Sequence, residues 1–326
     1  MKRMNLIVSV LVFLFMLGSV AVPNVAQAAD YTKRPIQLIC PWGAGGGTDR
    51  ISRMVAVLLE KELGQPVNVV NRTGGSGATG HTAGATARAD GYTITMITVE
   101  ITMMHWLGLA QVTYKDYKPV SLLNIDPAGV NVRADAQWKD LKELQNYVKT
   151  HPGELKASGT GKGGIWDLAR AGWLKAAGLG VKDVRWVPSR GAAPALQELV
   201  AGGIDVVTCS IPEAAPLAEA GKVRHLAIMA DQRDSVFPDV PTLKELGIDW
   251  SVGAWRGIAV PKETPDEVVK VLEPALAKIV ASTEFKDFMQ KNGFGILYKG
   301  SADFATFLSN MDASNGKIMK EAGIIK

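Results

Sequence analysis

The chain has few of the residues that build metal centres or disulfide frameworks. Its 326 residues include two cysteines and four histidines. Two cysteines are too few for a disulfide framework, so we expect Cys40 and Cys209 to be free thiols at the ends of buried strands. The histidines are far apart in the sequence and no two have the spacing of zinc ligands. We therefore expect no metal site.

The sequence also lacks a strong charge bias and, beyond its N-terminal segment, a long apolar run. It has 36 basic and 32 acidic residues, for a net charge of +4, and the basic residues form no cluster. Nothing in this balance favours nucleic acid as a partner. No segment after the N-terminus is apolar enough to span a bilayer.

The N-terminal segment has the features of a secretory signal peptide. Lys2 and Arg3 precede an apolar run over residues 6–22, and Ala26-Gln27-Ala28 follows as a small-residue cleavage site. The run is shorter than the ~20 residues of a membrane-spanning helix, which is the alternative interpretation. These features predict a signal peptide over residues 1–28, cleavage near Ala28 and a periplasmic location.

The rest of the chain, roughly 300 residues, is about twice the length of a modal domain. Strand-like and helix-like segments alternate through it, which favours an α/β fold with mostly parallel, mixed sheets flanked by helices. We expect two lobes: lobe I at 29–130 and 256–326, and lobe II at 131–255, with hinge strands near 123–132 and 253–260. After the second crossing we expect one helix over 265–282, a short strand and a final helix over 302–321.

Two motifs suggest alternatives to simple binding. Gly75, Gly77 and Gly80 match G-x-G-x-x-G before a helix, but the first glycine comes five residues after the preceding strand ends, so a packed loop is favoured over a dinucleotide site. The sequence has no G-x-S-x-G nucleophile motif. An exported hydrolase that acts on a small carboxylic ester or amide is the remaining enzymatic alternative.

Three loops end a strand and begin a helix, and they predict anion binding. They lie at residues 42–48, 159–164 and 189–194, one in lobe I and two in lobe II. The unpaired N–H groups and the dipole of a helix N-terminus favour a carboxylate, and glycine lets the backbone approach a ligand. Ligands of open α/β sheets bind at the carboxyl ends of the strands. The loops therefore predict a cleft that captures a small carboxylate, without a cofactor and without covalent chemistry.

Several segments resemble the solute receptors of tripartite tricarboxylate transporters, the Bug-type periplasmic binding proteins. The segments that carry the resemblance, in order along the chain, are residues 34–36, 41–49, 64–67, 71–72, 90–93, 191–196, 203–205, 220–224 and 237–242. The resemblance implies a type II periplasmic binding protein, a two-lobed clamshell that delivers its ligand to integral membrane subunits of a secondary transporter. It implies a receptor and not an enzyme, and we expect it to act as a monomer.

The resemblance also implies a set of contacts to a ligand carboxylate, which would be a dicarboxylate or an aromatic carboxylate. The candidate ligand-binding residues are Trp42, Ala44, Gly45, Gly46, Asp49, Thr98, Glu100, Ser158, Gly161, Gly163, Gly164, Ser189, Arg190, Gly191, Ala192, Asp205 and Trp255. Family members often have other residues at Gly43, at Ser189-Arg190 and over 162–167, so the identity of the ligand does not transfer.

Several of these residues, together with Arg256 and Trp166, are given individual roles. The resemblance implies that Asp49 and Asp205 support loops and water. Arg190 and Arg256 offer cationic donors for a second carboxylate, and we expect Arg190 to point into the cleft and to discriminate between ligands. Glu100 suits an amine or hydroxyl donor of the ligand, or faces water. Three tryptophans, Trp42, Trp166 and Trp255, either stack on a ring or pack at the rim.

Overall fold

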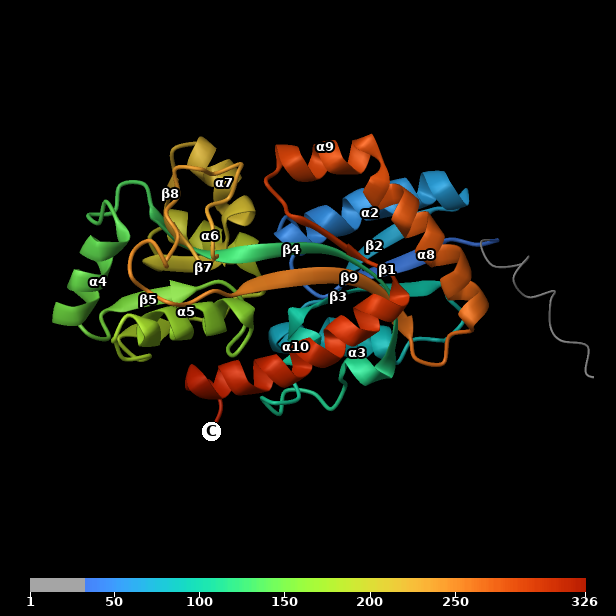
Figure 1. Ribbon diagram of the computed structural model, residues 1–326, viewed down its shortest axis with the longest axis horizontal. Coiled ribbons are helices and arrows are strands. Elements are labelled where there is room, and N and C mark those ends of the chain that lie inside the picture. Colours follow the sequence, from blue (N-terminus) through green and yellow to red (C-terminus); the bar gives the residue numbers. More distant parts are fainter. Residues whose placement is uncertain (1–32) are drawn as a thin grey trace, which may run out of the picture.

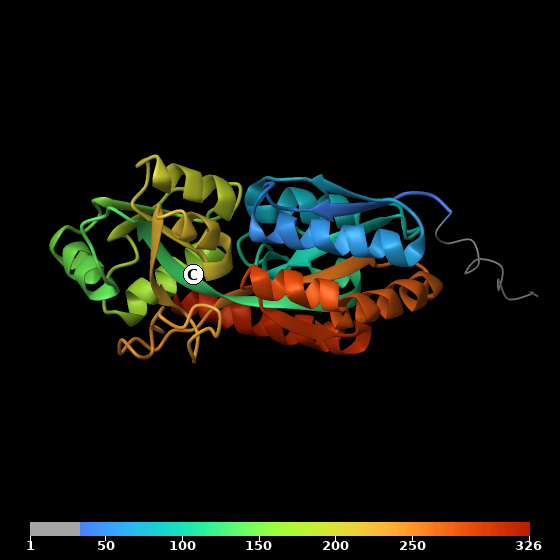
Figure 2. The same cartoon turned by 90° about the horizontal axis from the view of Figure 1, so that it is seen from above.

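The computed structural model describes residues 33–326, and the predicted signal peptide lies outside them. Two lobes lie side by side, and strand β4 (Tyr117–Arg133) runs from one into the other (Figure 1, Figure 2). Strand β9 (Gly253–Pro261) lies antiparallel to the first part of β4. These two long strands join the lobes near the places where the sequence predicts hinge strands.

Lobe I is built on strands β1 (Ile36–Cys40), β2 (Val67–Asn71), β3 (Thr93–Thr98) and β10 (Ile296–Lys299), together with β9 and the first part of β4. The order is β2-β1-β3-β9-β4, and β10 pairs with β4. Strands β1, β2 and β3 are parallel, whereas β9 is antiparallel to β3. Every residue of β1 but one is buried, as expected of a strand covered on both faces.

Helices cover both faces of this sheet (Figure 1). One face carries α2 (Gly47–Leu63), α8 (Asp266–Ala281) and α9 (Thr283–Lys291), and the other carries α3 (Ala78–Ala85) and α10 (Ser301–Glu321). Apolar side chains of α2, α8 and α9 form one core with β1 and β3. Helix α2 ends at Gly64, whose φ of 68° is in the left-handed region that favours glycine.

Lobe II is built on strands β5 (Leu155–Ser158), β6 (Val184–Trp186), β7 (Val206–Ser210) and β8 (Val223–Ile228). Strand β5 lies between β6 and β7 and is parallel to both, while β7 and β8 are antiparallel to the end of β4. The helices are α4 (Leu141–Thr150), α5 (Ile165–Ala176), α6 (Ala192–Val200) and α7 (Ile211–Glu219). Within residues 33–326, no helix combines the length and the apolar character needed to cross a bilayer.

The predicted fold class, two α/β lobes with mixed sheets, is confirmed. The single helix expected over 265–282 is continued by a separate helix, α9, which the sequence reading missed. Ser282 separates the two, because its hydroxyl accepts a hydrogen bond from the backbone N–H of Phe285 and caps α9. The cysteines are buried at β1 and β7, and both are free thiols. The lobe boundaries remain predictions.

Candidate functional site between the lobes

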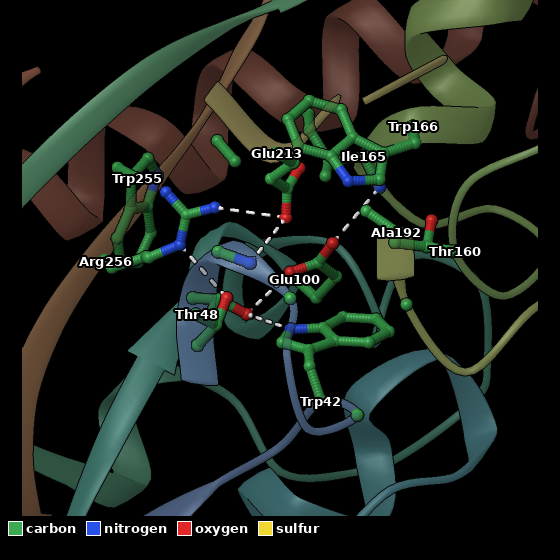
Figure 3. A pocket seen from close by; sticks show the side chains of 16 residues that line it. Trp42, Thr48, Glu100, Thr160, Ile165, Trp166, Ala192, Glu213, Trp255 and Arg256 are labelled. Atoms are coloured by element: carbon green, nitrogen blue, oxygen red, sulfur yellow. Dashed lines mark hydrogen bonds and ion pairs between the residues drawn. The ribbon is translucent and has the colours of Figure 1, made fainter. Parts of the chain in front are cut away.

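A pocket lies where the two lobes meet (Figure 3). Lobe I contributes the loop after β1, the first residues of α2 and the end of β3, and lobe II contributes the starts of α5, α6 and α7. Strand β9 closes one side. The lining residues are Trp42, Gly43, Gly46, Gly47, Thr48, Thr98, Glu100, Thr160, Ile165, Trp166, Gly191, Ala192, Glu213, Ala254, Trp255 and Arg256. All three predicted loops therefore meet at one site.

A chain of hydrogen bonds fixes the lobe I side of the pocket. The indole Nε1 of Trp42 donates to the hydroxyl of Thr98 (3.2 Å), and that hydroxyl donates to Glu100 Oε2 (2.6 Å). The backbone N–H of Thr98 donates to Nε2 of the buried His81 (3.1 Å). Each side chain is thereby held in one orientation, which pre-organises the wall for binding.

Arg256 places its guanidinium at the pocket, and the residue is 1% exposed. Its Nη1 lies 2.5 Å from Asp126 Oδ2 and donates also to the side-chain oxygen of Asn124 (2.5 Å). Its Nε donates to the Thr48 hydroxyl (3.0 Å), and its Nη2 lies 3.6 Å from Glu213 Oε1 (Figure 3). Burial raises the pKa of the Asp126 carboxyl, and the nearby guanidinium opposes that rise. Arg256 is thus already paired with groups of the protein.

Two glutamate carboxylates, one from each lobe, accept hydrogen bonds from the opposite lobe. Glu213 in lobe II accepts from the backbone N–H of Gly47 at the start of α2 (3.1 Å), and Glu100 in lobe I accepts from the N–H of Ile165 at the start of α5 (3.2 Å). Each therefore occupies a helix N-terminus of the other lobe, the position at which an anion is most stable. Burial raises the pKa of both carboxyl groups. These contacts hold the lobes together in a closed arrangement.

Further hydrogen bonds cross the same interface. The N–H of Gly43 donates to the backbone oxygen of Arg190 (3.1 Å), and the hydroxyl of Ser76 donates to the backbone oxygen of Lys162 (2.9 Å). Glycine is needed where the backbones of the two lobes approach each other closely. A Cβ on Gly161 would lie 2.8 Å from the Cα of Ser76.

The candidate ligand-binding residues divide into two groups. Those that line the pocket are Trp42, Gly46, Thr98, Glu100, Gly191, Ala192 and Trp255. The remainder lie outside the pocket lining formed by the described residues: Ala44, Gly45, Asp49, Ser158, Gly161, Gly163, Gly164, Ser189, Arg190 and Asp205. Most of the second group belong to the three predicted loops.

The two aspartates differ in what they support. Asp49 is buried and accepts from the N–H of Gly45 (2.9 Å) and from Asn71 (2.8 Å), so it braces the first loop. Burial acts to raise its pKa, but hydrogen bonds from Arg53, Gly45 and Asn71 lower it overall. Asp205 accepts from the N–H of Lys156 (2.8 Å) before β7 begins, at the end of that strand away from the pocket. It holds a strand-end turn and not the cleft.

The structure places Arg190 and Glu100 differently with respect to the pocket. The Arg190 side chain is exposed and is not among the described residues that line the pocket; its backbone oxygen accepts the hydrogen bond from Gly43. Glu100 is 3% exposed, which rules out the suggestion that it faces water. The glycine motif at Gly75 to Gly80 forms a 3₁₀ turn and the first turn of α3. It is closely packed, because a Cβ on Gly80 would lie 2.6 Å from the backbone oxygen of Arg72.

Sequence reasoning missed Glu213 altogether. The signal that identifies it is the spacing Ser210-x-x-Glu213 after β7, which is a capping box. The N–H and the hydroxyl of Ser210 both donate to Glu213 Oε2 (3.2 Å each), which leaves Oε1 free to reach Gly47. Thr48 and Thr160 were missed individually, although their loops were identified, and Ile165, the first residue of α5, was also missed.

Two α/β lobes that are joined by long strands and enclose a pocket define a class of protein, the receptors that close on a solute by hinge motion. The family model for the tripartite tricarboxylate transporter family receptor matches residues 51–324. A protein from the gbd 5′ region of Cupriavidus necator is 30% identical, over 95% of this chain and 94% of its own length. BugT of Bordetella pertussis is 31% identical over 76% of each chain. This chain belongs to the tripartite tricarboxylate transporter receptor family.

Solved structures agree with this assignment. The periplasmic binding protein BugD is 27% identical with a TM-score of 0.85, covering 90% of this chain and 99% of its own. MatC of Rhodopseudomonas palustris with bound malate is 29% identical with a TM-score of 0.82, covering 88% and 99%. A ligand-free receptor of this family from Polaromonas is 36% identical with a TM-score of 0.64, covering 89% and 99%.

Proposed function

We propose that this protein is an extracytoplasmic receptor that captures a small carboxylate-bearing ligand between its lobes and delivers it to the membrane subunits of a tripartite transporter. The observation that carries the proposal is the pocket enclosed between the lobes, lined by helix N-termini and by the Arg256 guanidinium. Such groups bind carboxylates by backbone N–H donation and by charge.

The solved relatives support both the ligand class and a hinge. One relative holds malate and another, Rpa4515 of R. palustris, holds adipate. The ligand-free Polaromonas receptor superposes less well (TM-score 0.64) than these two (0.82 and 0.84), although its sequence is more similar. A difference in the angle between two lobes produces this pattern. We assign the hinge to β4 and β9, with lobe boundaries near residues 130 and 256.

Export follows from the N-terminal sequence. We propose that the signal peptide is removed after Ala28 and that the receptor works as a monomer in the periplasm. Intact mass measurement of the protein from a periplasmic extract should place its N-terminus at or next to Ala29. A chain that retains Met1 in the membrane fraction would contradict this.

The ligand itself is the decisive test of function. The mature protein is purified without denaturation, and the small molecule that co-purifies with it is identified by native mass spectrometry. We expect a carboxylate that rebinds saturably in isothermal titration and is recovered chemically unchanged after incubation. Recovery of a hydrolysis product would instead establish the hydrolase alternative, and saturable binding confined to ligands without a carboxylate would refute the proposed ligand class.

A further inference from the structure

Helix α7 of lobe II contains a proline that deprives one of its backbone oxygens of its usual partner. Pro216 lies inside the helix, where the N–H of residue 216 would ordinarily donate to the backbone oxygen of Pro212. Proline has no N–H, so this hydrogen bond is missing. Pro212 is itself buried, and a buried carbonyl oxygen without a donor lowers stability. The start of α7 therefore offers an acceptor to a donor from outside the helix.

Arg50 of lobe I is that donor. Its Nη1 donates to the Pro212 oxygen at 3.2 Å, in a partly buried place between the lobes. Two residues of lobe I hold the guanidinium: the side-chain oxygen of Asn292 accepts from Nη2, and the ring centroid of Phe294 lies 4.9 Å from the guanidinium carbon. Asn292 is fixed in turn by donating to the backbone oxygen of Phe288 (2.7 Å). Lobe I thus orients Arg50 towards lobe II.

The contact belongs to a seam between the lobes that lies outside the pocket. Next to Asn292, Phe237 of lobe II covers Gly293 of lobe I, where a Cβ would lie 2.4 Å from the phenylalanine ring. Phe237 packs on apolar side chains of its own lobe, among them Ile211. Neither Arg50 nor Phe237 is among the described residues that line the pocket. A substitution in this seam therefore changes a contact between the lobes and leaves the pocket lining as it is.

We infer that Arg50 is a positioning residue, which stabilises the closed arrangement through the Pro212 oxygen and so raises the affinity for a ligand that it does not touch. Only contacts that differ between two conformations shift the equilibrium between them. Arg50 keeps Asn292 and Phe294 when the lobes part, because all three belong to lobe I. It loses Pro212, which moves with lobe II. The inference rests on the proposed function, since it requires that closure of the lobes is coupled to ligand binding.

A double-mutant cycle tests whether Arg50 acts through this oxygen. Pro216→Ala supplies the missing N–H, so that α7 satisfies the Pro212 oxygen by itself. Affinity is measured by isothermal titration with the carboxylate that co-purifies with the protein, or with succinate where none does. We expect Arg50→Met to lower the affinity about tenfold, the range of a hydrogen bond from a charged donor, but less than about threefold in the Pro216→Ala background. Pro216→Ala alone should also lower the affinity, because the helix N–H competes with Arg50 for the oxygen.

Stability separates this role from a merely structural one. Pro216→Ala should raise the midpoint of thermal unfolding, because alanine favours a helix interior over proline, while the affinity falls. A structural role alone would move stability and affinity in the same direction. Arg50→Lys keeps a charged donor and should retain more affinity than Arg50→Met. Lys61→Met is the control on the same helix: Lys61 is exposed and pairs within lobe I with Glu284, so the affinity should not change.

The outcomes separate this inference from the proposed function. If Arg50→Met lowers the affinity by the same factor in both backgrounds, Arg50 does not act through the Pro212 oxygen and the inference is wrong, while the carboxylate receptor stands. Wild-type affinity in the Pro216→Ala variant overturns it as well, and that result does not depend on whether Arg50→Met folds. If no carboxylate binds saturably to the wild-type protein, the proposed function fails and this inference with it.

Discussion

The backbone N–H of Gly47 donates a hydrogen bond to the carboxylate of Glu213 across the interface between the lobes, at 3.1 Å. Gly47 is the first residue of α2, and Glu213 lies in the first turn of α7. A Cβ on Gly47 would lie 2.9 Å from both Arg256 Nη2 and Glu213 Cγ. Glycine is therefore required here by close approach and not by an unusual backbone angle.

Replacing Gly47 by Ala should weaken the closed state. The methyl group would separate α2 from Glu213 and Arg256, so we expect the affinity for a carboxylate ligand to fall by at least about tenfold in isothermal titration. Thermal unfolding checks that the variant is folded. An unchanged affinity in the folded variant would show that the Gly47 to Glu213 contact does not control binding.

Removing Arg256 should cost more in stability than removing an exposed cation. Arg256→Met leaves Asp126 buried without its partner, which we expect to lower the free energy of unfolding by about 3–5 kcal/mol in urea titrations. Asp126→Asn in the same chain should restore part of that loss, because the uncompensated charge is then gone. Lys61→Met, which breaks an exposed pair with Glu284, should cost at most about 1 kcal/mol. Similar losses for Arg256→Met and Lys61→Met would contradict the argument.

His81 should make the protein sensitive to acid. Its Nε2 accepts from the Thr98 N–H, so its Nδ1 carries the proton and donates to the Gly77 oxygen (2.8 Å). Burial lowers the pKa of His81 from 6.5 to about 4. Between these values the unfolded chain binds a proton that the folded chain does not, so the folded state loses stability as the pH falls from 6.5 towards 4. The shift corresponds to about 3 kcal/mol.

The measurement compares wild type with His81→Phe, which removes the titrating group. The variant will be less stable at pH 7 because it lacks both hydrogen bonds, but the gap between the two proteins should narrow as the pH falls to 4. The comparison is needed because other groups titrate as well. His225 has the same lowered pKa, and the raised pKa of Glu100, Glu213 and Asp126 acts in the opposite direction. A gap that is constant with pH would show that His81 is not buried as the neutral form.

Local signals were sufficient to predict much of the fold. Strand β1 is a mostly apolar segment between Pro35 and Pro41, and α2 begins after a glycine-rich loop and ends at Gly64. The three ligand loops could be located because each joins a strand to a helix. The boundary between α8 and α9 was missed, since the only local mark is a single capping serine.

The hydrogen bonds and ion pairs of the pocket could not be predicted, because they join residues that are distant in the sequence. Arg256 contacts Asn124 and Thr48 across 132 and 208 residues, and these contacts follow from the register in which β9 pairs with β3 and β4. The same limit explains Arg190. Its place after a lobe II strand suggested a cleft residue, but at the turn into α6 the backbone faces lobe I while the side chain is exposed.

Arg190 should therefore have little influence on ligand choice. Its backbone oxygen accepts from Gly43 whatever its side chain is, so Arg190→Ala keeps that interlobe contact. An exposed guanidinium contributes little through a screened charge, and we expect affinities for succinate and butyrate to change by less than about threefold, and by similar factors. Isothermal titration of both acids against wild type and the variant measures this. A selective loss of dicarboxylate binding would place the guanidinium at the ligand and restore Arg190 as the residue that discriminates between ligands.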